Sequence, residues 1–319
     1  MNILCSICKK KTIVYFSNKF DDRYGYKKLF DIFHCNKCQH KFLIHNFKTN
    51  DLKDLYSNYY PRSHFSISDY KPLQLSKNKF IAWFNGDNGA HQYVPKNVKV
   101  LDIGCGFGGS IGYHLQRGCD AYGVEADSNI KKVVDHYGFN IKNGVFSYKD
   151  YKKNSFDYVT LDQVLEHMVD PIHTLKDISK ILKPAGVLVI NIPNSKSWGA
   201  RLFKSKWIHW HIPYHLQHFS KQSIQLAAKQ SEFNIFKIKT FTSSEWLHYQ
   251  WMSLVAYPKY GNKSIFWENK VSKLSKFSLK FWSFVFLKLL HKTKINHILT
   301  RIFDFLGMGD NLVVILTKK

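Results

Sequence analysis

Three glycines, Gly104, Gly106 and Gly108, stand between a run of apolar residues and an amphipathic segment. The run predicts a buried strand over 98–103, and the apolar period after the glycines predicts a helix over 110–116. Glycine lacks a Cβ, so the backbone can approach a ligand closely at this strand-to-helix turn. The N–H groups at the start of the helix attract a polar or anionic part of that ligand. The spacing therefore predicts a cofactor site, which a nicotinamide dinucleotide would also fit.

Acidic side chains accompany this turn. Glu125 follows the predicted strand 121–124. In a doubly wound sheet, an acidic residue at that position accepts hydrogen bonds from the two ribose hydroxyls of a nucleoside. Asp102 directly precedes the glycine turn, Cys105 lies within it, and Asp162 follows a later apolar run. We expect all four residues to belong to the cofactor site.

Four of the six cysteines form two C-x-x-C pairs, Cys5 with Cys8 and Cys35 with Cys38. Four thiolates at this spacing suit tetrahedral Zn²⁺ and leave no open position for water, so we expect a structural zinc rather than a catalytic one. The segment between the pairs can hold a β-hairpin, and HCNKCQHKF resembles the second knuckle of a zinc ribbon. The alternative is two reduced pairs without metal.

Strand and helix signals alternate from residue 98 to residue 230. This alternation is typical of a parallel sheet with helices on both faces, so we expect a doubly wound α/β fold. Strands 233–241 and 312–317 are expected to close the sheet as an antiparallel pair. The other expected strands are 98–103, 121–124, 140–142, 156–161 and 187–192, and the expected helices are 110–116, 130–137, 172–182 and 220–230, the last capped by Ser220.

Composition divides the chain into five parts: a zinc-ribbon-like module over 1–50, a tyrosine-rich segment over 51–97, a cofactor-binding core over 98–242, a basic insertion over 243–309, and a final strand of the core over 310–319. The tyrosine-rich segment ends in an expected helix over 73–84 and forms either a lid over the pocket or an aromatic linker packed on the core. Within the insertion, 270–290 carries lysines at helical intervals. Such a helix suits an anionic membrane surface, a lid on the core or a dimer face.

Two further segments carry the residues of a known family. Residues 156–171 read FDYVTLDQVLEHMVDP, and residues 182–190 read LKPAGVLVI, in which Ala185 stands where the family pattern has a glycine. Together with the glycine turn, these segments resemble the class I methyltransferases that use S-adenosylmethionine (SAM), a family with a Rossmann-like sheet. The resemblance covers residues 98–193 and argues against a nicotinamide-dependent dehydrogenase.

The resemblance assigns roles to the cofactor residues. Glu125 would accept the ribose hydroxyls of SAM, and Gly104 and Gly106 would pass close to its amino-acid part. Asp102 would orient the loop and face the methionine amino group through a water molecule. Because the methyl group of SAM is already activated on a sulfonium centre, the protein has to align the acceptor and, for a hydroxyl, remove a proton.

Residues 207–219, WIHWHIPYHLQHF, hold four of the 16 histidines. In methyltransferases that this chain resembles, a P-x-H-L-x-x-F-S segment lines the acceptor pocket. Histidine has a pKa near neutral pH, so we expect His215 of this segment to act as the general base, with His167 as the second candidate. Tyr214 and His218 are expected to position the substrate. The alternative for each histidine is a structural role, and no carboxylate stands at a spacing typical of a histidine metal site.

The order of the parts, ending in GMGDNLVV, is similar to zinc-bearing methyltransferases of surface-polysaccharide and nucleotide-sugar pathways. The sugar C-methyltransferases among them carry a further C-terminal domain that this sequence lacks, so O-methylation of a sugar hydroxyl is the main expectation. One alternative acceptor is a tRNA base or a quinone-like phenol, since VLEHMVDP also resembles ubiquinone-pathway O-methyltransferases. The other alternative is a non-catalytic, zinc-bearing module that binds nucleic acid.

The chain has 47 Lys and Arg residues against 23 Asp and Glu residues, a formal net charge of +24. This charge attracts phosphates, so the expected partners are a phosphate-bearing small-molecule or glycan acceptor and an anionic membrane face, with nucleic acid less favoured. No leader peptide and no run of about 18 apolar residues is evident in the sequence. We therefore expect a cytoplasmic protein with peripheral contact to the inner membrane face.

Overall fold

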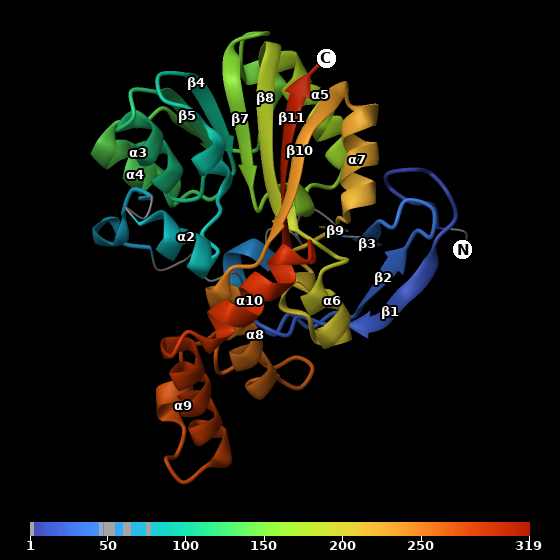
Figure 1. Cartoon of the computed structure of the whole chain (residues 1–319), viewed down its shortest axis with the longest axis vertical. Coiled ribbons are helices and arrows are strands. Elements are labelled where there is room, and N and C mark those ends of the chain that lie inside the picture. Colours follow the sequence, from blue (N-terminus) through green and yellow to red (C-terminus); the bar gives the residue numbers. More distant parts are fainter. Residues whose placement is uncertain (1–2, 45–46, 48–54, 60–64, 75–77) are drawn as a thin grey trace.

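The computed structural model describes residues 3–44, 47, 55–59, 65–74 and 78–319. Its centre is a seven-stranded sheet with the order β10-β11-β8-β7-β4-β5-β6 (Figure 1). The strands from β6 to β8 are parallel, β11 runs antiparallel to β8, and β10 runs antiparallel to β11. The predicted α/β fold and its closing antiparallel pair are thus confirmed. The strands are β4 (Lys99–Ile103), β5 (Asp120–Glu125), β6 (Ile141–Asn143), β7 (Phe156–Asp162), β8 (Leu182–Pro193), β10 (Phe233–Phe241) and β11 (Asn311–Lys318).

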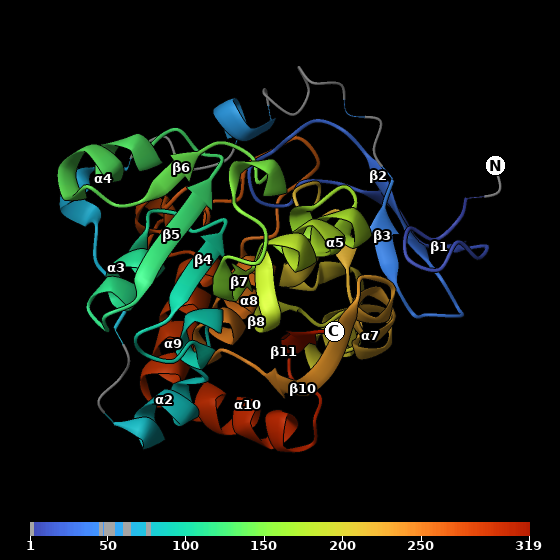
Figure 2. The same ribbon diagram turned by 90° about the horizontal axis from the view of Figure 1, so that it is seen from above.

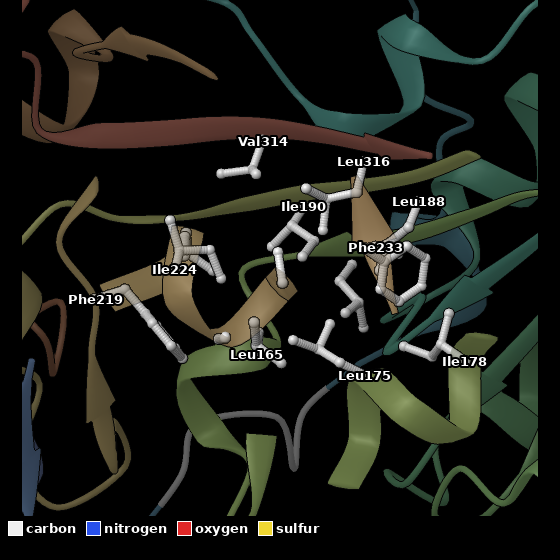
Figure 3. Packing of buried hydrophobic residues seen from close by; sticks show 14 of the residues in the cluster. Leu165, Leu175, Ile178, Leu188, Ile190, Phe219, Ile224, Phe233, Val314 and Leu316 are labelled. Atoms are coloured by element: carbon white, nitrogen blue, oxygen red, sulfur yellow. The ribbon is translucent and has the colours of Figure 1, made fainter. Parts of the chain in front are cut away.

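Successive residues of β8 point to opposite faces of the sheet, as they must in a strand. Leu188 and Ile190 pack with α5 (Pro171–Ile181) and α7 (Lys221–Gln230) in the largest apolar cluster (Figure 3). Val189, which lies between them, packs instead against Ala90 of the short helix η3 (Ala90–Tyr93). Both faces of the sheet are therefore covered, which explains the continuous apolar run of this strand.

Side-chain caps set where the helices of the core begin. Asp170 caps α5 by accepting a hydrogen bond from the backbone N–H of His173, and Pro171 occupies the first turn. Ser220 and Ser223 cap α7 reciprocally, as the sequence predicted for Ser220. The other helices of the core are α3 (Gly109–Leu115), α4 (Ile130–Tyr137), α6 (Trp198–Phe203), η4 (Tyr148–Asp150), η5 (Leu165–His167), η6 (Lys204–Lys206) and η7 (Ile208–Trp210).

A second, four-stranded antiparallel sheet has the order β1-β2-β3-β9. Its first three strands, β1 (Ile13–Lys19), β2 (Phe30–His34) and β3 (Lys41–Leu43), come from the cysteine-rich segment, and β1 and β2 form the expected hairpin. The fourth strand, β9 (Gln217–His218), comes from the histidine-rich segment of the core. The N-terminal segment is therefore hydrogen-bonded directly to the core.

The insertion between β10 and β11 contains α8 (Ser244–Val255), η8 (Val271–Lys273), α9 (Leu279–Lys292) and α10 (Ile295–Phe305). The helix predicted over 270–290 is wrong at its start, because Ser278 accepts a hydrogen bond from Phe281 N–H and begins α9 only at Leu279. Figure 1 shows α9 at the end of the molecule furthest from the central sheet. Among the described residues, no helix is both long and apolar enough to cross a membrane.

The tyrosine-rich segment is described only in part. Residues 51–54, 60–64 and 75–77, on which much of the predicted lid and part of the predicted helix fall, lie outside the described residues. The helix predicted over 73–84 is wrong at its start, because Leu73 and Gln74 are described and are not helical. The helix α2 (Lys79–Asn85) begins after Asn78, whose side chain accepts hydrogen bonds from two backbone N–H groups, and packs beside α10 (Figure 2). Two short helical turns, η1 (Leu55–Tyr59) and η2 (Ile67–Asp69), precede it.

Truncation of Ile190 tests the packing of the central sheet. Ile190→Ala removes buried methyl groups between β8 and helices α5 and α7, and we expect a loss of about 2–5 kcal/mol in the free energy of unfolding. Phe236→Ala on β10, where the side chain is 71% exposed, serves as the control and should cost about 0.5 kcal/mol or less. Urea unfolding followed by circular dichroism measures both, and equal losses would contradict the packing.

Candidate functional site

A cavity of about 770 Å³ opens at the carboxyl ends of β4, β5 and β7. In the sheet β4 lies between β5 and β7. From β4 the chain continues to β5 on one side, and from β7 it continues to β8 on the other side. Open parallel sheets bind ligands in the crevice that such a reversal creates. This end of the cavity, called the cofactor end below, is lined by Gly104 after β4, by residues 125–129 at and after the end of β5, and by residues 162–164 at and after the end of β7. It is the place where the sequence predicted the cofactor.

The glycine turn needs its glycines for two different reasons. Gly104 has a φ of 71°, and a Cβ at this residue would lie 2.5 Å from Cγ2 of Val164. Gly106 has a φ of 57° and no atom within 4 Å of the place that a Cβ would take. The first glycine thus permits close packing beneath the loop. The second permits a left-handed backbone, which glycine adopts more readily than other residues.

Glu125 connects the two loops on either side of the cofactor end. Its Oε2 accepts a hydrogen bond of 2.8 Å from the backbone N–H of Gly106, and its Oε1 accepts one of 2.9 Å from Asp127 N–H. The carboxylate lines the cavity although its residue is only 7% exposed. Each carboxylate oxygen has a second lone pair, so the side chain can also accept hydrogen bonds from a ligand's hydroxyls.

Asp102, Asp162 and Cys105 support this end from different positions. Asp102 is buried and accepts hydrogen bonds from the hydroxyls of Ser110 and Thr160, which tie β4 to α3 and β7. Burial raises the pKa of Asp102 to about 7. Asp162 lines the cavity and accepts a 2.7 Å hydrogen bond from Ala90 N–H. Asp102 and Cys105 are not among the residues that line the described cavity, and Cys105 is buried in the apolar cluster of β4–β6.

The opposite end of the cavity, called the acceptor end below, is built from three separate parts of the chain. The loop between β1 and β2 contributes Arg23 and Tyr24, and the insertion contributes Trp246 and Trp267. The core contributes four histidines, which are His167, His209, His211 and His215. The structure therefore brings together the two predicted bases, His215 and His167, whose rings are 4.7 Å apart. This end can hold a polar, flat acceptor between aromatic walls.

Backbone carbonyls determine which nitrogen of the two histidines carries hydrogen. Nδ1 of His215 lies 2.9 Å from the carbonyl oxygen of His209, and Nδ1 of His167 lies 2.9 Å from that of Tyr214. A carbonyl oxygen only accepts, so each neutral ring donates from Nδ1 and keeps the lone pair on Nε2. Nε2 of His215 is 4.0 Å from Oε1 of Glu166. An imidazole in this tautomer can accept a proton at Nε2.

Glu166 lies inside the VLEH stretch, is 1% exposed, and was not among the site residues predicted from the sequence. Burial raises the pKa of Glu166 to about 8 and lowers the pKa of His215 well below its usual range. Glu166, His167 and His215 each offer one ligand atom, and these atoms lie within 4.8 Å of one another. Three protein ligands are what a catalytic metal ion takes in many enzymes, so these three residues could also hold a divalent cation.

Tyr214 and His218, which were expected to position the substrate, are not among the residues that line the described cavity. The ring of Tyr214 packs 4.9 Å from that of His211 and 5.6 Å from that of Tyr24, behind the wall. His218 belongs to β9, and its ring packs 4.9 Å from that of Trp210. Both are buried because the segment 207–219 turns only some of its side chains toward the cavity.

The four cysteines Cys5, Cys8, Cys35 and Cys38 converge, with all sulfur atoms within 4.8 Å of one another. The Sγ atoms of Cys5 and Cys38 are 3.5 Å apart, and those of Cys8 and Cys35 are 3.3 Å apart. In tetrahedral zinc sites with Zn–S bonds of about 2.3 Å, the sulfur atoms are about 3.8 Å apart. The donor set and its spacing therefore fit Zn²⁺.

One residue connects this cysteine site to the histidines. The carbonyl of Leu216 accepts a 2.9 Å hydrogen bond from Leu43 N–H of β3, and its own N–H donates to the Glu166 carbonyl at 2.8 Å. Next to it, Oε1 of Gln217 accepts hydrogen bonds from Nε2 of His40 at 2.9 Å and from Oγ of Ser6 at 3.2 Å. Hydrogen bonds through Leu216 and Gln217 thus connect the two C-x-x-C turns to the acceptor end of the cavity.

Comparison with known proteins identifies the fold and the family. The pattern of the methyltransferase-domain family matches residues 78–238, half of the chain. The solved phosphoethanolamine N-methyltransferase 2 of Haemonchus contortus, in complex with S-adenosyl-L-methionine, is similar with a TM-score of 0.51 and 20% identity, over 87% of this chain and 62% of that one.

Curated relatives match a shorter stretch. The ubiquinone biosynthesis O-methyltransferase of Erwinia tasmaniensis is 30% identical over 155 residues, which is 46% of this chain and 62% of that protein. The demethylmenaquinone methyltransferase of Staphylococcus saprophyticus is 28% identical over 104 residues, 30% of this chain and 45% of that protein. The chain spans about half the length of the curated relatives it matches.

Substitution of Glu125 tests the cofactor end. Glu125→Ala removes the acceptor of two backbone N–H groups and the expected partner of the ribose hydroxyls, so SAM affinity should fall by about tenfold or more. Isothermal titration of SAM into each protein measures the change. Asp120→Ala, at the exposed start of β5, is the matched control and should keep the affinity of the unmodified chain. Unchanged affinity in Glu125→Ala would place the cofactor elsewhere.

Proposed function

Because this chain belongs to the family of SAM-dependent methyltransferases, we propose that it transfers the methyl group to a hydroxyl of a small acceptor bound among the histidines. SAM, when bound at Gly104 and Glu125, supplies a methyl group on a sulfonium sulfur that leaves as a neutral thioether. One continuous cavity joins these residues to His167 and His215. Enclosure of both reactants in one cavity aligns them and excludes water.

The proposed acceptor is a quinone-like phenol. Trp246, Trp267 and Tyr24 line the acceptor end, and aromatic side chains of this kind pack against a flat ring. Curated relatives named as ubiquinone biosynthesis O-methyltransferases support a phenolic acceptor over the sugar hydroxyl that the sequence first favoured. A sugar hydroxyl on a nucleotide sugar or glycan is the second acceptor class, because aromatic walls also pack against sugar rings.

His215 is the proposed general base. Its Nδ1 hydrogen is held by the His209 carbonyl, so Nε2 is the atom that takes the hydroxyl proton. Oε1 of Glu166 lies 4.0 Å from that nitrogen. In its ionised form, which the raised pKa of about 8 confines to alkaline pH, this carboxylate would stabilise the imidazolium that forms. His167 is the second candidate, since the Tyr214 carbonyl holds its Nδ1 in the same way.

The first test uses methyl-labelled SAM, the purified chain and a fractionated bacterial extract. Label is followed separately into phenols and quinones, nucleotide sugars, lipid-linked glycans and RNA. Label in the phenol fraction is the expected result. Label in a sugar fraction or in RNA would replace the proposed acceptor class while leaving the methyl transfer intact.

With an acceptor identified, His215→Ala should lower kcat by about 10²- to 10⁴-fold and leave the affinity for SAM unchanged, because the residue lies at the acceptor end. His173→Ala, on the exposed side of α5, is the control and should retain full activity. Unchanged turnover in His215→Ala would show that His215 is not the general base. A requirement for an added divalent cation would instead make His215, His167 and Glu166 a metal ligand set.

We propose a structural Zn²⁺ at the four cysteines. Bound zinc would hold the two knuckles in place, and β3, which follows the second knuckle, pairs with β9 next to His215. Zinc would therefore stabilise the acceptor end, whereas the cofactor end is built by β4, β5 and β7.

The double variant Cys35→Ser and Cys38→Ser tests whether the cysteine site stabilises the acceptor end but not the cofactor end. We expect loss of the bound metal from about one zinc per chain and loss of methyl transfer, with an affinity for SAM within about threefold of the unmodified chain. Elemental analysis, labelled-methyl assays and SAM titration give the three measurements, and Cys119→Ser, distant from the cluster, is the control. Full activity in the zinc-free variant would refute the stabilising role.

A further inference from the structure

Arg23 brings a positive charge to the acceptor end of the cavity. It lies in the loop between β1 and β2, is 4% exposed and lines the cavity. Its Nη2 donates a 2.5 Å hydrogen bond to the Ile208 carbonyl. The guanidinium carbon lies 4.4 Å from the ring centre of Trp267 and 6.0 Å from that of Trp246. These contacts hold the side chain in one place.

The loop that carries Arg23 is itself ordered. The carboxylate of Asp21, which is fully buried, accepts hydrogen bonds from the backbone N–H groups of Arg23, Tyr24 and Tyr26 at 2.9–3.1 Å. The Ser264 N–H of the insertion donates to the Arg23 carbonyl at 2.9 Å. Arg23 is therefore presented by a fixed backbone that connects the N-terminal sheet to the insertion.

The charge of Arg23 has no ion-pair partner within 4 Å in the part of the chain that the structure describes. The neighbouring Asp22 makes no such pair. Burial raises the pKa of its carboxyl group, and the charges of Arg23 and Lys19 act against that rise from a longer distance. The histidines of this end add no negative charge. The acidic residues that line the cavity lie at the cofactor end: Glu125 ends β5, Asp127 follows it, and Asp162 ends β7. A buried guanidinium with one hydrogen bond from its side chain and no carboxylate in contact with it is costly unless a ligand supplies the anion.

We propose that the acceptor carries an anionic group, a carboxylate or a phosphate, which binds Arg23 while the hydroxyl to be methylated lies next to His215. Arginine suits this role because its planar fork donates two parallel hydrogen bonds to a carboxylate or a phosphate. Trp246 and Trp267 would cover the body of the acceptor between its two polar ends. This inference rests on the proposed function and adds what the acceptor has to contain.

The test compares acceptors that differ only in charge. One pair is a dihydroxybenzoate and the matching dihydroxybenzamide, and the other is a hexose phosphate and the free hexose. We expect the unmodified chain to prefer the anionic member of one pair by about tenfold or more in kcat/KM, and the pair that reacts identifies the source of the anion. Arg23→Gln should abolish this preference, Arg23→Lys should retain part of it, and neither should change the affinity for SAM. Lys27→Gln, an exposed change in the same loop, is the control.

A binding measurement separates this proposal from the proposed function. Benzoate and inorganic phosphate are titrated into the chain and followed by tryptophan fluorescence, since Trp246 and Trp267 adjoin Arg23. Saturable binding that is lost in Arg23→Gln and partly kept in Arg23→Lys supports the anionic site even if no acceptor is turned over. Methyl transfer without any preference for charge, or a preference and anion binding that survive Arg23→Gln, would overturn it.

Discussion

Leu216 is hydrogen-bonded through its backbone on both sides, to Leu43 of the N-terminal sheet and to Glu166 of the loop after β7. The side chains on either side of it in sequence are His215, which faces the cavity, and Gln217, which contacts the cysteine knuckle. A displacement of this short segment would move a proposed base and its carboxyl neighbour together. The geometry of the acceptor end thus depends on a pairing between segments that are far apart in the chain.

The two ends of the cavity are formed by different kinds of structure. At the cofactor end, the Glu125 carboxylate and backbone N–H groups are arranged by parallel strands of one sheet. At the acceptor end, the N-terminal loop, the insertion, the histidine segment and His167 after β7 supply the walls, and none of the described helices or strands spans them all. Such an arrangement lets the first end stay constant while the second is altered by changes in loops.

Site residues whose position is set by their neighbours in the sequence could be predicted. A strand, a glycine turn and an acidic residue one strand later place Gly104 and Glu125 at one edge of any doubly wound sheet. The start of α9 was misplaced because a hydrogen bond of one serine, rather than the lysine period, determines it. Arg23 could not be singled out among 47 basic residues, since only its burial against Trp267 distinguishes it. Glu166 could not be singled out either, because only its distance to His215 in the folded chain distinguishes it.

The pairing of β3 with β9 also has a consequence for how the chain is made. Strand β3 is complete at residue 43, but its neighbour β9 begins at residue 217, so the 173 residues between them have to be synthesised before this edge is covered. An uncovered strand edge is a template for pairing with other chains. The nascent N-terminal sheet therefore keeps one open edge until β9 is made, and its short three-residue β3 limits the surface that a wrong partner can occupy.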